Sequence, residues 1–360
     1  MSTTIPHVRL VDLLHVGRQQ DASDIHLVPG LPATLRIDGE LQFLAGSPVS
    51  SDETAEIARA LFERDALARL EAGSDVSITT IPDDRLVLRV HGFRSATGMT
   101  IAIRLLNKQI PTLESLHLPP IVAALAQRDH GLIIFSGPTG SGKSTSLAAL
   151  IREINTTSSR RIITIEDPIE YRHESVRSLI TQREIGRDAP SFSAALLGAL
   201  RADPDVIMLG EMRDGATMQA ALTAAETGHV VFTTVHTGTA VQTIERIIDA
   251  FVGSEQAQVR SQLAASLAAV VAQRLLPRKH GNGRRAAVEV LLANDAVRTM
   301  IRESRTHLIR NAMTTSRQSG MQTLEHHLSE LVLGSEIDRE VARRVSEHFE
   351  DLAVSRQAGG

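Results

Sequence analysis

The pattern of apolar and polar residues divides the chain into two parts. In the first hundred residues, apolar side chains recur at helical spacing over 8–19 and 52–70, and these two segments are expected to be helices. Shorter alternating stretches, bounded by Pro-Gly and Asp-Gly pairs, predict strands over 25–28, 34–37, 41–44, 76–81, 85–90 and 99–105. Strands and helices without regular alternation indicate an α+β unit.

A different pattern begins after residue 120. Apolar strands are expected over 132–135, 162–165, 206–209 and 230–233. Helices are expected between them, over 143–154, 191–200 and 216–225. Such alternation is typical of a parallel sheet that is covered on both faces. From Thr239 onward the chain is predicted to be mostly helical, with one strand over 286–292.

The change of pattern suggests a domain boundary. Residues 107–120 contain Pro111, Pro119 and Pro120, and this segment is the expected linker. We predict an N-terminal domain over 1–106 and a second domain over 121–350 that ends in helices. Residues 351–360 are expected to form a flexible tail.

Composition narrows the possible functions. The chain has 38 Lys and Arg against 42 Asp and Glu, and its aromatic residues are eight Phe and one Tyr. The resulting net charge of −4 and the lack of stacking residues argue against direct nucleic-acid binding. The absence of cysteine excludes disulfides, thiol catalysis and cysteine-ligated metals. No apolar run is long enough for a transmembrane segment, so we expect a soluble, cytoplasmic protein that meets a membrane only through a partner.

Residues 137–144 match the pattern of a phosphate-binding loop placed between an expected strand and an expected helix. Glycines allow backbone N–H groups to wrap around phosphates, and the helix N-terminus adds partial positive charge. Lys143 is suited to reach the β- and γ-phosphates, and Ser144 can ligate Mg²⁺. The predicted nucleotide-binding residues are Gly137, Pro138, Thr139, Gly140, Ser141, Gly142, Lys143, Ser144 and Thr145.

Three further polar residues follow the next expected strands, namely Glu166, Glu211 and His236. If those strands are parallel, their ends meet at the edge of the sheet where ligands bind. We predict that Glu211 orients or deprotonates the attacking water and that Glu166 assists in the Mg²⁺ or water shell. His236 is a candidate γ-phosphate sensor, and His229 is a second nucleotide-binding candidate. The alternatives are a helix N-terminal charge for Glu211 and a structural role for either histidine.

Four sequence boxes occur in an order and spacing that resemble the secretion ATPase superfamily, specifically the PilT-type retraction motors of type IV pili. The boxes are a Walker A segment (136–145), an Asp box (164–171), a Walker B segment (203–214) and a His box (224–237). Residues 22–27 and 35–39 are similar to the opening signature of that family. The resemblance covers about residues 21–344, and the segments 178–185, 296–303 and 320–323 favour the retraction class.

The resemblance implies fold class α/β, with an N-terminal α+β PAS-like domain followed by a RecA-like P-loop ATPase domain with a helical C-terminal region. It also implies a ring of six subunits that hydrolyses ATP with Mg²⁺ to power pilus retraction and twitching motility. Arg89 and Arg104 stand where the family places arginines that reach the γ-phosphate. The implied partner is an inner-membrane pilus platform protein, with the motor at the inner face of that membrane. In the same family, the amphipathic segment 293–305 couples ATP hydrolysis to retraction; a packed helix is its alternative role.

Some residues depart from the family pattern. Leu197 and Gly198 stand where Arg-Ala is more frequent, Gly238 replaces Ser or Asn, and Arg310 replaces a frequent Pro. These departures leave the ATPase chemistry intact, and they leave open how closely partner contacts and regulation follow the retraction motors.

Other functions remain open at this stage. Within the motor class, a PilU-like motor or a DotB-like motor of conjugation or type IV secretion is possible. A pilus-assembly or type II secretion ATPase is less favoured, because those motors carry a tetracysteine zinc module. A nucleic-acid motor with the same RecA-like core and an ATP-binding switch with negligible turnover are the alternatives from other classes.

Overall fold

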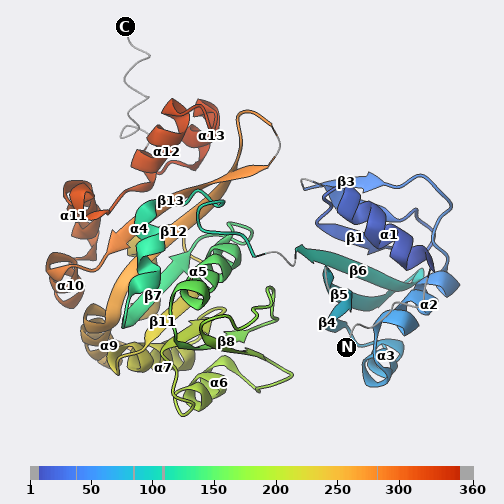
Figure 1. Ribbon diagram of the computed structural model, residues 1–360, viewed down its shortest axis with the longest axis horizontal. Coiled ribbons are helices and arrows are strands. Elements are labelled where there is room, and N and C mark those ends of the chain that lie inside the picture. Colours follow the sequence, from blue (N-terminus) through green and yellow to red (C-terminus); the bar gives the residue numbers. More distant parts are fainter. Residues whose placement is uncertain (1–7, 38, 84–85, 108–109, 282, 349–360) are drawn as a thin grey trace, which may run out of the picture. The chain divides into compact units, whose positions relative to one another are not determined.

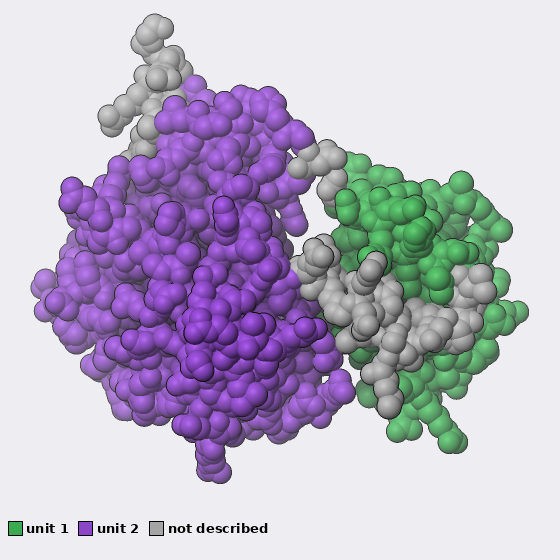
Figure 2. Space-filling view, in the orientation of Figure 1, with its two compact units in different colours: residues 1–109 green, residues 110–360 purple. Residues whose placement is uncertain are grey.

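The computed structural model describes residues 8–37, 39–83, 86–107, 110–281 and 283–348. The chain forms two compact units, residues 1–109 and residues 110–360, which are described separately (Figures 1 and 2). The predicted tail, 351–360, lies outside the described residues.

The first unit contains a six-stranded antiparallel sheet in the order β3-β2-β1-β6-β5-β4. Its strands are β1 (Asp24–Leu27), β2 (Thr34–Ile37), β3 (Glu40–Phe43), β4 (Val76–Asp83), β5 (Leu86–Ser95) and β6 (Gly98–Asn107). One face packs against the helices α1 (Val8–Gln19), α2 (Ser51–Leu61) and α3 (Arg64–Glu71). The other face carries the polar positions that alternate with this core.

The expected helix over 52–70 is divided into α2 and α3. Ser50 and Glu53 form a capping box that starts α2. Phe62 then takes an extended conformation and is buried in the core, which ends α2 before Glu63 begins the next turn. The hydrophobic spacing on the two sides of Phe62 is continuous enough to read as one helix, so this break was not predictable from the period alone.

The second unit is built on a seven-stranded sheet in the order β13-β12-β7-β11-β10-β8-β9. All its strands are parallel except β13, which pairs antiparallel with β12. The strands are β7 (Gly131–Ser136), β8 (Arg161–Glu166), β9 (Leu179–Glu184), β10 (Val206–Leu209), β11 (Val230–Val235), β12 (Leu267–Pro277) and β13 (Arg284–Leu292). The parallel alternation predicted from the sequence is therefore observed, and the α/β class is confirmed.

Helices cover both faces of this sheet, as Figure 1 shows. One face packs against α4 (Pro120–Ala124) and α5 (Lys143–Thr157). The other packs against α6 (Phe192–Ala199), α7 (Gly215–Glu226), α8 (Ala240–Ile248), α9 (Gly253–Ser266), α10 (Asp295–Arg302) and α11 (Ile309–Thr315). A smaller core joins α12 (Leu324–Leu333) and α13 (Arg339–Val345) to the ends of β12 and β13.

Two parts of this unit differ from the prediction. The segment expected to be helical after Thr239 contains β12, which lies next to the central strand β7 and is buried along most of its length. Its run of Leu, Ala and Val suits a buried helix and a buried strand equally well. The predicted linker also packs onto the second unit, where Leu113 is buried in the core.

Among the helices of the described residues, none has both the length and the hydropathy that a bilayer-spanning segment needs.

Candidate nucleotide-binding site

The phosphate-binding loop connects β7 to α5, as its sequence predicts. Gly137 and Gly142 have φ angles of 142° and 88°, in the region that favours glycine. A side chain at Gly137 would come within 2.2 Å of the carbonyl oxygen of Gln273, so the loop tolerates no Cβ there. Pro138, Thr139 and Gly140 at the tip are exposed. The loop therefore forms an open cradle at the N-terminus of a helix, which suits an anion.

The side chain of Lys143 is fixed at the phosphate-binding loop by two hydrogen bonds. Its side chain is buried, and Nζ donates hydrogen bonds to the carbonyl oxygens of Gly137 and Pro138 at 2.8 and 3.0 Å. Burial lowers the pKa of Lys143, and the nearby carboxylates of Glu170 and Glu211 oppose that shift. A phosphate would supply the negative charge that the two carbonyl groups only partly replace.

Gln273 on β12 supports the loop from below. Its Nε2 donates to the carbonyl oxygen of Ser141 at 2.8 Å, and its Oε1 accepts the hydroxyl of Ser146 at 2.9 Å. The residue is 2% exposed, so both bonds are shielded from water. The sequence offered no signal for this role, because Gln273 lies in the segment expected to be helical. A strand expected there would have placed it beside β7.

Glu211 and His236 meet at the same edge of the sheet. Glu211 follows β10 and His236 follows β11, and His236 Nε2 lies 3.5 Å from Glu211 Oε2. Arg213, which the motif analysis did not single out, also pairs with Glu211, with Nη2 at 2.6 Å from Oε1. Glu211 is 9% exposed, whereas the side chain of Arg213 is 71% exposed. Because Arg213 is exposed, water can compete with it for the buried carboxylate of Glu211.

Glu166 ends β8 beside this group, but both its oxygens are occupied. Oε1 accepts the hydroxyl of Thr164 at 2.7 Å and the amide of Gln182 at 3.1 Å, and Oε2 accepts the backbone N–H of Glu170 at 3.4 Å. Burial raises the pKa of Glu166 to about 7, and these hydrogen bonds limit the rise. Its proton content therefore changes near neutral pH.

His229 lies at the other end of β11, next to Val230. The strand pairs in register with β7 from Val230 opposite Gly131 to Val235 opposite Ser136, so five residue steps separate the two ends. That span is about 17 Å at the usual rise per residue. The His229 ring bonds the carbonyl oxygen of Ala224 at 2.9 Å. The structure therefore does not bring His229 to the phosphate-binding loop of its own chain, and its role in nucleotide binding stays a prediction.

Arg89 and Arg104 belong to the first unit and are direct cross-strand neighbours on β5 and β6. The same row continues to Asp24 on β1 and Arg36 on β2. Arg104 Nε donates a hydrogen bond to Asp24 Oδ1 at 2.9 Å. The side chain of Arg104 is 56% exposed, so the rest of its guanidinium group is accessible to solvent. Like charges placed opposite each other destabilise a sheet. The row therefore suits an anion that supplies the missing negative charge.

The residues at the loop fit ATP and Mg²⁺. The hydroxyl of Ser141 is buried without a hydrogen-bond partner, and a Cβ at Gly140 would meet nothing within 4 Å. Ser144, next in sequence to Lys143, is exposed at the start of α5. Among the described residues, no cluster of three or more His, Asp or Glu could hold a metal alone. Mg²⁺ commonly takes few protein ligands together with phosphate oxygens and water, so Ser144 with more distant carboxylates is a suitable set.

Comparisons with known proteins agree with this site. The family model described as "Type II/IV secretion system protein" matches residues 8–348. The Pseudomonas aeruginosa protein named type IV pilus retractation ATPase PilT is 39% identical over 343 residues, which cover 94% of this chain and 99% of that protein. A twitching motility protein of Neisseria gonorrhoeae is 39% identical over 344 residues, covering 96% of this chain and 92% of that protein.

A solved structure extends the agreement to the fold. The crystal structure of the pilus retraction motor PilT with bound ADP matches with a TM-score of 0.87 and 40% identity, covering 95% of this chain and 98% of that chain. The chain belongs to the type II/IV secretion system protein family, and its predicted resemblance to the PilT-type retraction ATPases is confirmed.

Proposed function

We propose that this protein is an ATP-hydrolysing motor that powers type IV pilus retraction and thereby twitching motility. The observation that carries the proposal is the meeting of a complete phosphate-binding loop with Glu211 and His236 at one sheet edge. Relatives named for pilus retraction and twitching match this chain over nearly its whole length.

In the proposed reaction, the loop holds the phosphates of ATP, and Lys143 exchanges its carbonyl partners for phosphate oxygens. Glu211 orients or deprotonates the attacking water, with His236 beside it to respond to the γ-phosphate. Arg213 would have to release Glu211 for that role, which its exposure permits. Glu166 assists, and its hydrogen bonds to Thr164 and Gln182 fix its orientation.

Ser144 would ligate the Mg²⁺, with Glu166 and Glu211 reaching it partly through water. When bound, the ion neutralises phosphate charge during transfer.

Arg89 and Arg104 are the proposed arginine fingers of the first unit. Their charges are placed side by side at the cost of repulsion, and Asp24 fixes one guanidinium through Nε. Such residues can accelerate phosphoryl transfer by a factor on the order of a thousand. Under this proposal, each nucleotide state favours a different arrangement of the two units, and a ring of six subunits converts that change into movement. The proposed partner is a pilus platform protein in the inner membrane, with the motor on its cytoplasmic side.

Steady-state ATP hydrolysis by the purified chain tests the enzymatic part. Glu211→Gln should bind ATP normally and lower kcat by at least a hundred-fold, because it keeps the shape and removes the base. Full turnover in Glu211→Gln would remove Glu211 from its role. Normal turnover in the Arg89→Ala, Arg104→Ala double variant would remove the arginine fingers.

Function in cells separates retraction from the related motors. Deleting the gene should abolish twitching while surface pili remain, and the intact chain should restore movement. Restoration of substrate secretion or DNA transfer, without an effect on pili, would instead support a DotB-like motor. Stimulation of the ATPase by DNA or RNA would support a nucleic-acid motor.

A further inference from the structure

The single tyrosine of the chain lies beside the phosphate-binding loop. Tyr171 belongs to the connection between β8 and β9, and its hydroxyl lies 3.0 Å from Oγ1 of Thr145, within hydrogen-bond distance. Thr145 is the third residue of α5, where the first N–H groups have no partner inside the helix and can bind an anion. The contact therefore joins a separate loop to the part of α5 that is suited to receive phosphate.

The backbone around Tyr171 is fixed by one side chain of the edge strand β9. Gln182 Nε2 donates to the carbonyl oxygen of Tyr171 at 2.8 Å, and Gln182 Oε1 accepts the N–H of His173 at 2.8 Å. The same Nε2 donates to Glu166 Oε1 at 3.1 Å. One amide group thus fixes both the loop that carries Tyr171 and the carboxylate that ends β8. The place of the phenol ring does not depend on the Thr145 contact alone.

The hydrogen bond between Tyr171 and Thr145 can run in either direction, because each hydroxyl has one proton to donate and lone pairs that accept. Phosphate oxygens act as acceptors. A Thr145 hydroxyl that turns to a phosphate must therefore donate its proton there, and its oxygen is left to accept from Tyr171. Hydrogen bonds that run in one direction polarise and strengthen one another.

The phenol of Tyr171 is suited to be the donor in such a chain. Burial raises the pKa of Tyr171, so its hydroxyl keeps its proton at neutral pH. Tyr171 and Thr145 are both half-buried, which shields their contact from part of the competing water. The bond can therefore be made without excluding solvent completely.

We propose that Tyr171 is a positioning residue for the nucleotide, which donates its phenol proton to Thr145 and so directs the Thr145 hydroxyl to a phosphate oxygen. Tyr171 acts through Thr145, and Gln182 keeps its backbone in place. The inference rests on the proposed nucleotide site and deepens it, because it adds a residue outside the phosphate-binding loop to the set that orients the phosphates.

The Raman spectrum of the unaltered chain tests the direction of the contact. Tyrosine gives a Raman doublet whose intensity ratio reports whether the phenol donates or accepts a hydrogen bond, and in this chain the doublet comes from Tyr171 alone. In the complex with ADP and Mg²⁺, the ratio should be that of a donating phenol. A ratio typical of an accepting or unbonded phenol in that complex would overturn the proposal. The Tyr171→Phe chain lacks the doublet and serves as the blank.

The affinity for ADP tests the effect of the contact. Tyr171→Phe removes the hydroxyl and keeps the ring, so the Kd for ADP, measured by calorimetry, should rise about five-fold, the equivalent of one ordinary hydrogen bond. KM for ATP should rise by a similar factor, with a smaller effect on kcat. The melting temperature should change little, since water can reach both half-buried hydroxyl groups. An unchanged Kd would overturn the proposal, whatever the melting temperature.

A double-mutant cycle tests the route through Thr145. Thr145→Val removes the hydroxyl and keeps the branched shape, so adding Tyr171→Phe to Thr145→Val should raise the Kd no further. An equal increase in both backgrounds would overturn the route. Thr157→Val is the matched control, because it removes a hydroxyl that donates to the carbonyl oxygen of Glu153 at the other end of α5. This control should bind ADP as the wild type does.

The tests with ADP do not depend on turnover, so the two proposals can fail separately. Normal ATP hydrolysis by the wild-type chain, with an unchanged Kd in Tyr171→Phe, would reject the role of Tyr171 and leave the ATPase. ADP binding with a donating phenol, in a wild-type chain that hydrolyses no ATP, would reject the proposed ATPase and support the role of Tyr171.

Discussion

Gln273 offers the most direct way to test how the phosphate-binding loop is supported. Gln273→Leu keeps most of the volume but removes the bonds to the Ser141 carbonyl and the Ser146 hydroxyl, both made in the interior. Each buried polar group left without a partner costs roughly 1–3 kcal/mol. We therefore expect the chain to lose about 2–6 kcal/mol of stability, and the melting temperature to fall by roughly 5–20 °C.

The same change should weaken nucleotide binding. Without Gln273, the phosphate-binding loop must become ordered when ADP binds. The conformational entropy lost in that ordering makes binding less favourable. We expect the Kd for ADP, measured by calorimetry, to rise about ten-fold, which corresponds to about 1.4 kcal/mol.

Two comparisons make this result specific. Gln256→Leu removes a bond to the carbonyl oxygen of Phe251 at 3.2 Å, on α9 away from the loop, and should lower stability without changing ADP affinity. In a double-mutant cycle, Ser146→Ala and Gln273→Leu should couple by about 1 kcal/mol. Unaltered ADP binding in Gln273→Leu, or additive effects in the cycle, would refute the support role.

Three further predictions concern other parts of the chain. Arg298→Ala should lower the melting temperature and the ATPase together, because Nη1 of Arg298 donates to the carbonyl oxygens of Ala264 and Ala265 at the end of α9; a stable variant that loses only retraction would contradict this. Asp24→Asn should lower kcat several-fold with little change in KM, since Arg104 loses its charged anchor; Ser23→Ala serves as the control. The raised pKa of Glu166 means that the folded chain binds an extra proton, so its contribution to stability is full below about pH 4.5 and lost as pH rises through about 7. Glu166→Gln should therefore reduce the change in unfolding free energy between pH 5 and 8, measured by urea denaturation, by up to about 3 kcal/mol. An unchanged pH dependence of the unfolding free energy would refute the assignment.

The site could be predicted from the sequence where its chemistry lies within one short segment. The phosphate-binding loop is such a segment, and Glu211 and His236 each follow an apolar strand directly. Their meeting followed from one assumption, that β7, β8, β10 and β11 are parallel, which the structure confirms. The same rule places His229 at the opposite edge, because it precedes its strand.

The parts that could not be predicted depend on contacts between distant segments. Gln273 reaches Ser146 across 127 positions, and Glu289 reaches Ala240 across 49. Neither Gln273 nor Glu289 lies in a motif. The strand β12 was not predicted, because its apolar run fits a helix equally well. The amphipathic pattern of 293–305 correctly suggested a helix, but it did not show that Arg298 donates to carbonyl oxygens at the end of α9.

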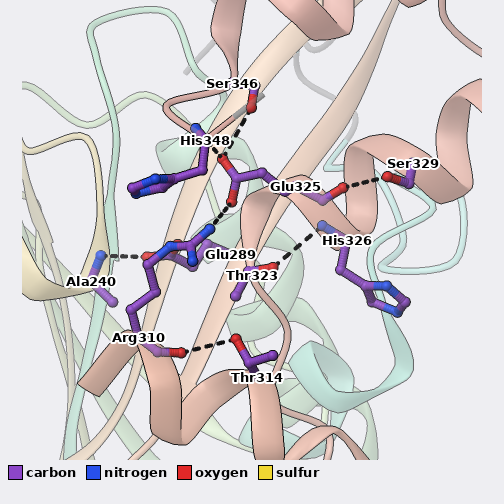
Figure 3. A network of polar contacts seen from close by, with 10 residues as sticks. All are labelled: Ala240, Glu289, Arg310, Thr314, Thr323, Glu325, His326, Ser329, Ser346 and His348. Carbon is purple, nitrogen blue, oxygen red and sulfur yellow. Dashed lines mark hydrogen bonds and ion pairs between the residues drawn. The ribbon is translucent and has the colours of Figure 1, made fainter. Parts of the chain in front are cut away.

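These distant contacts share one element, the β12–β13 hairpin. Ala272 pairs with Glu289 and Gln273 pairs with Val288, so the two supporting side chains occupy neighbouring rungs of one antiparallel ladder. Gln273 holds the phosphate-binding loop, and Glu289 holds the start of α8 behind the His236 loop. A displacement of this hairpin would therefore move both sides of the nucleotide site together. The C-terminal helices contact the same hairpin, because α12 packs on β13 and its Glu325 pairs with Arg310 of α11 (Figure 3).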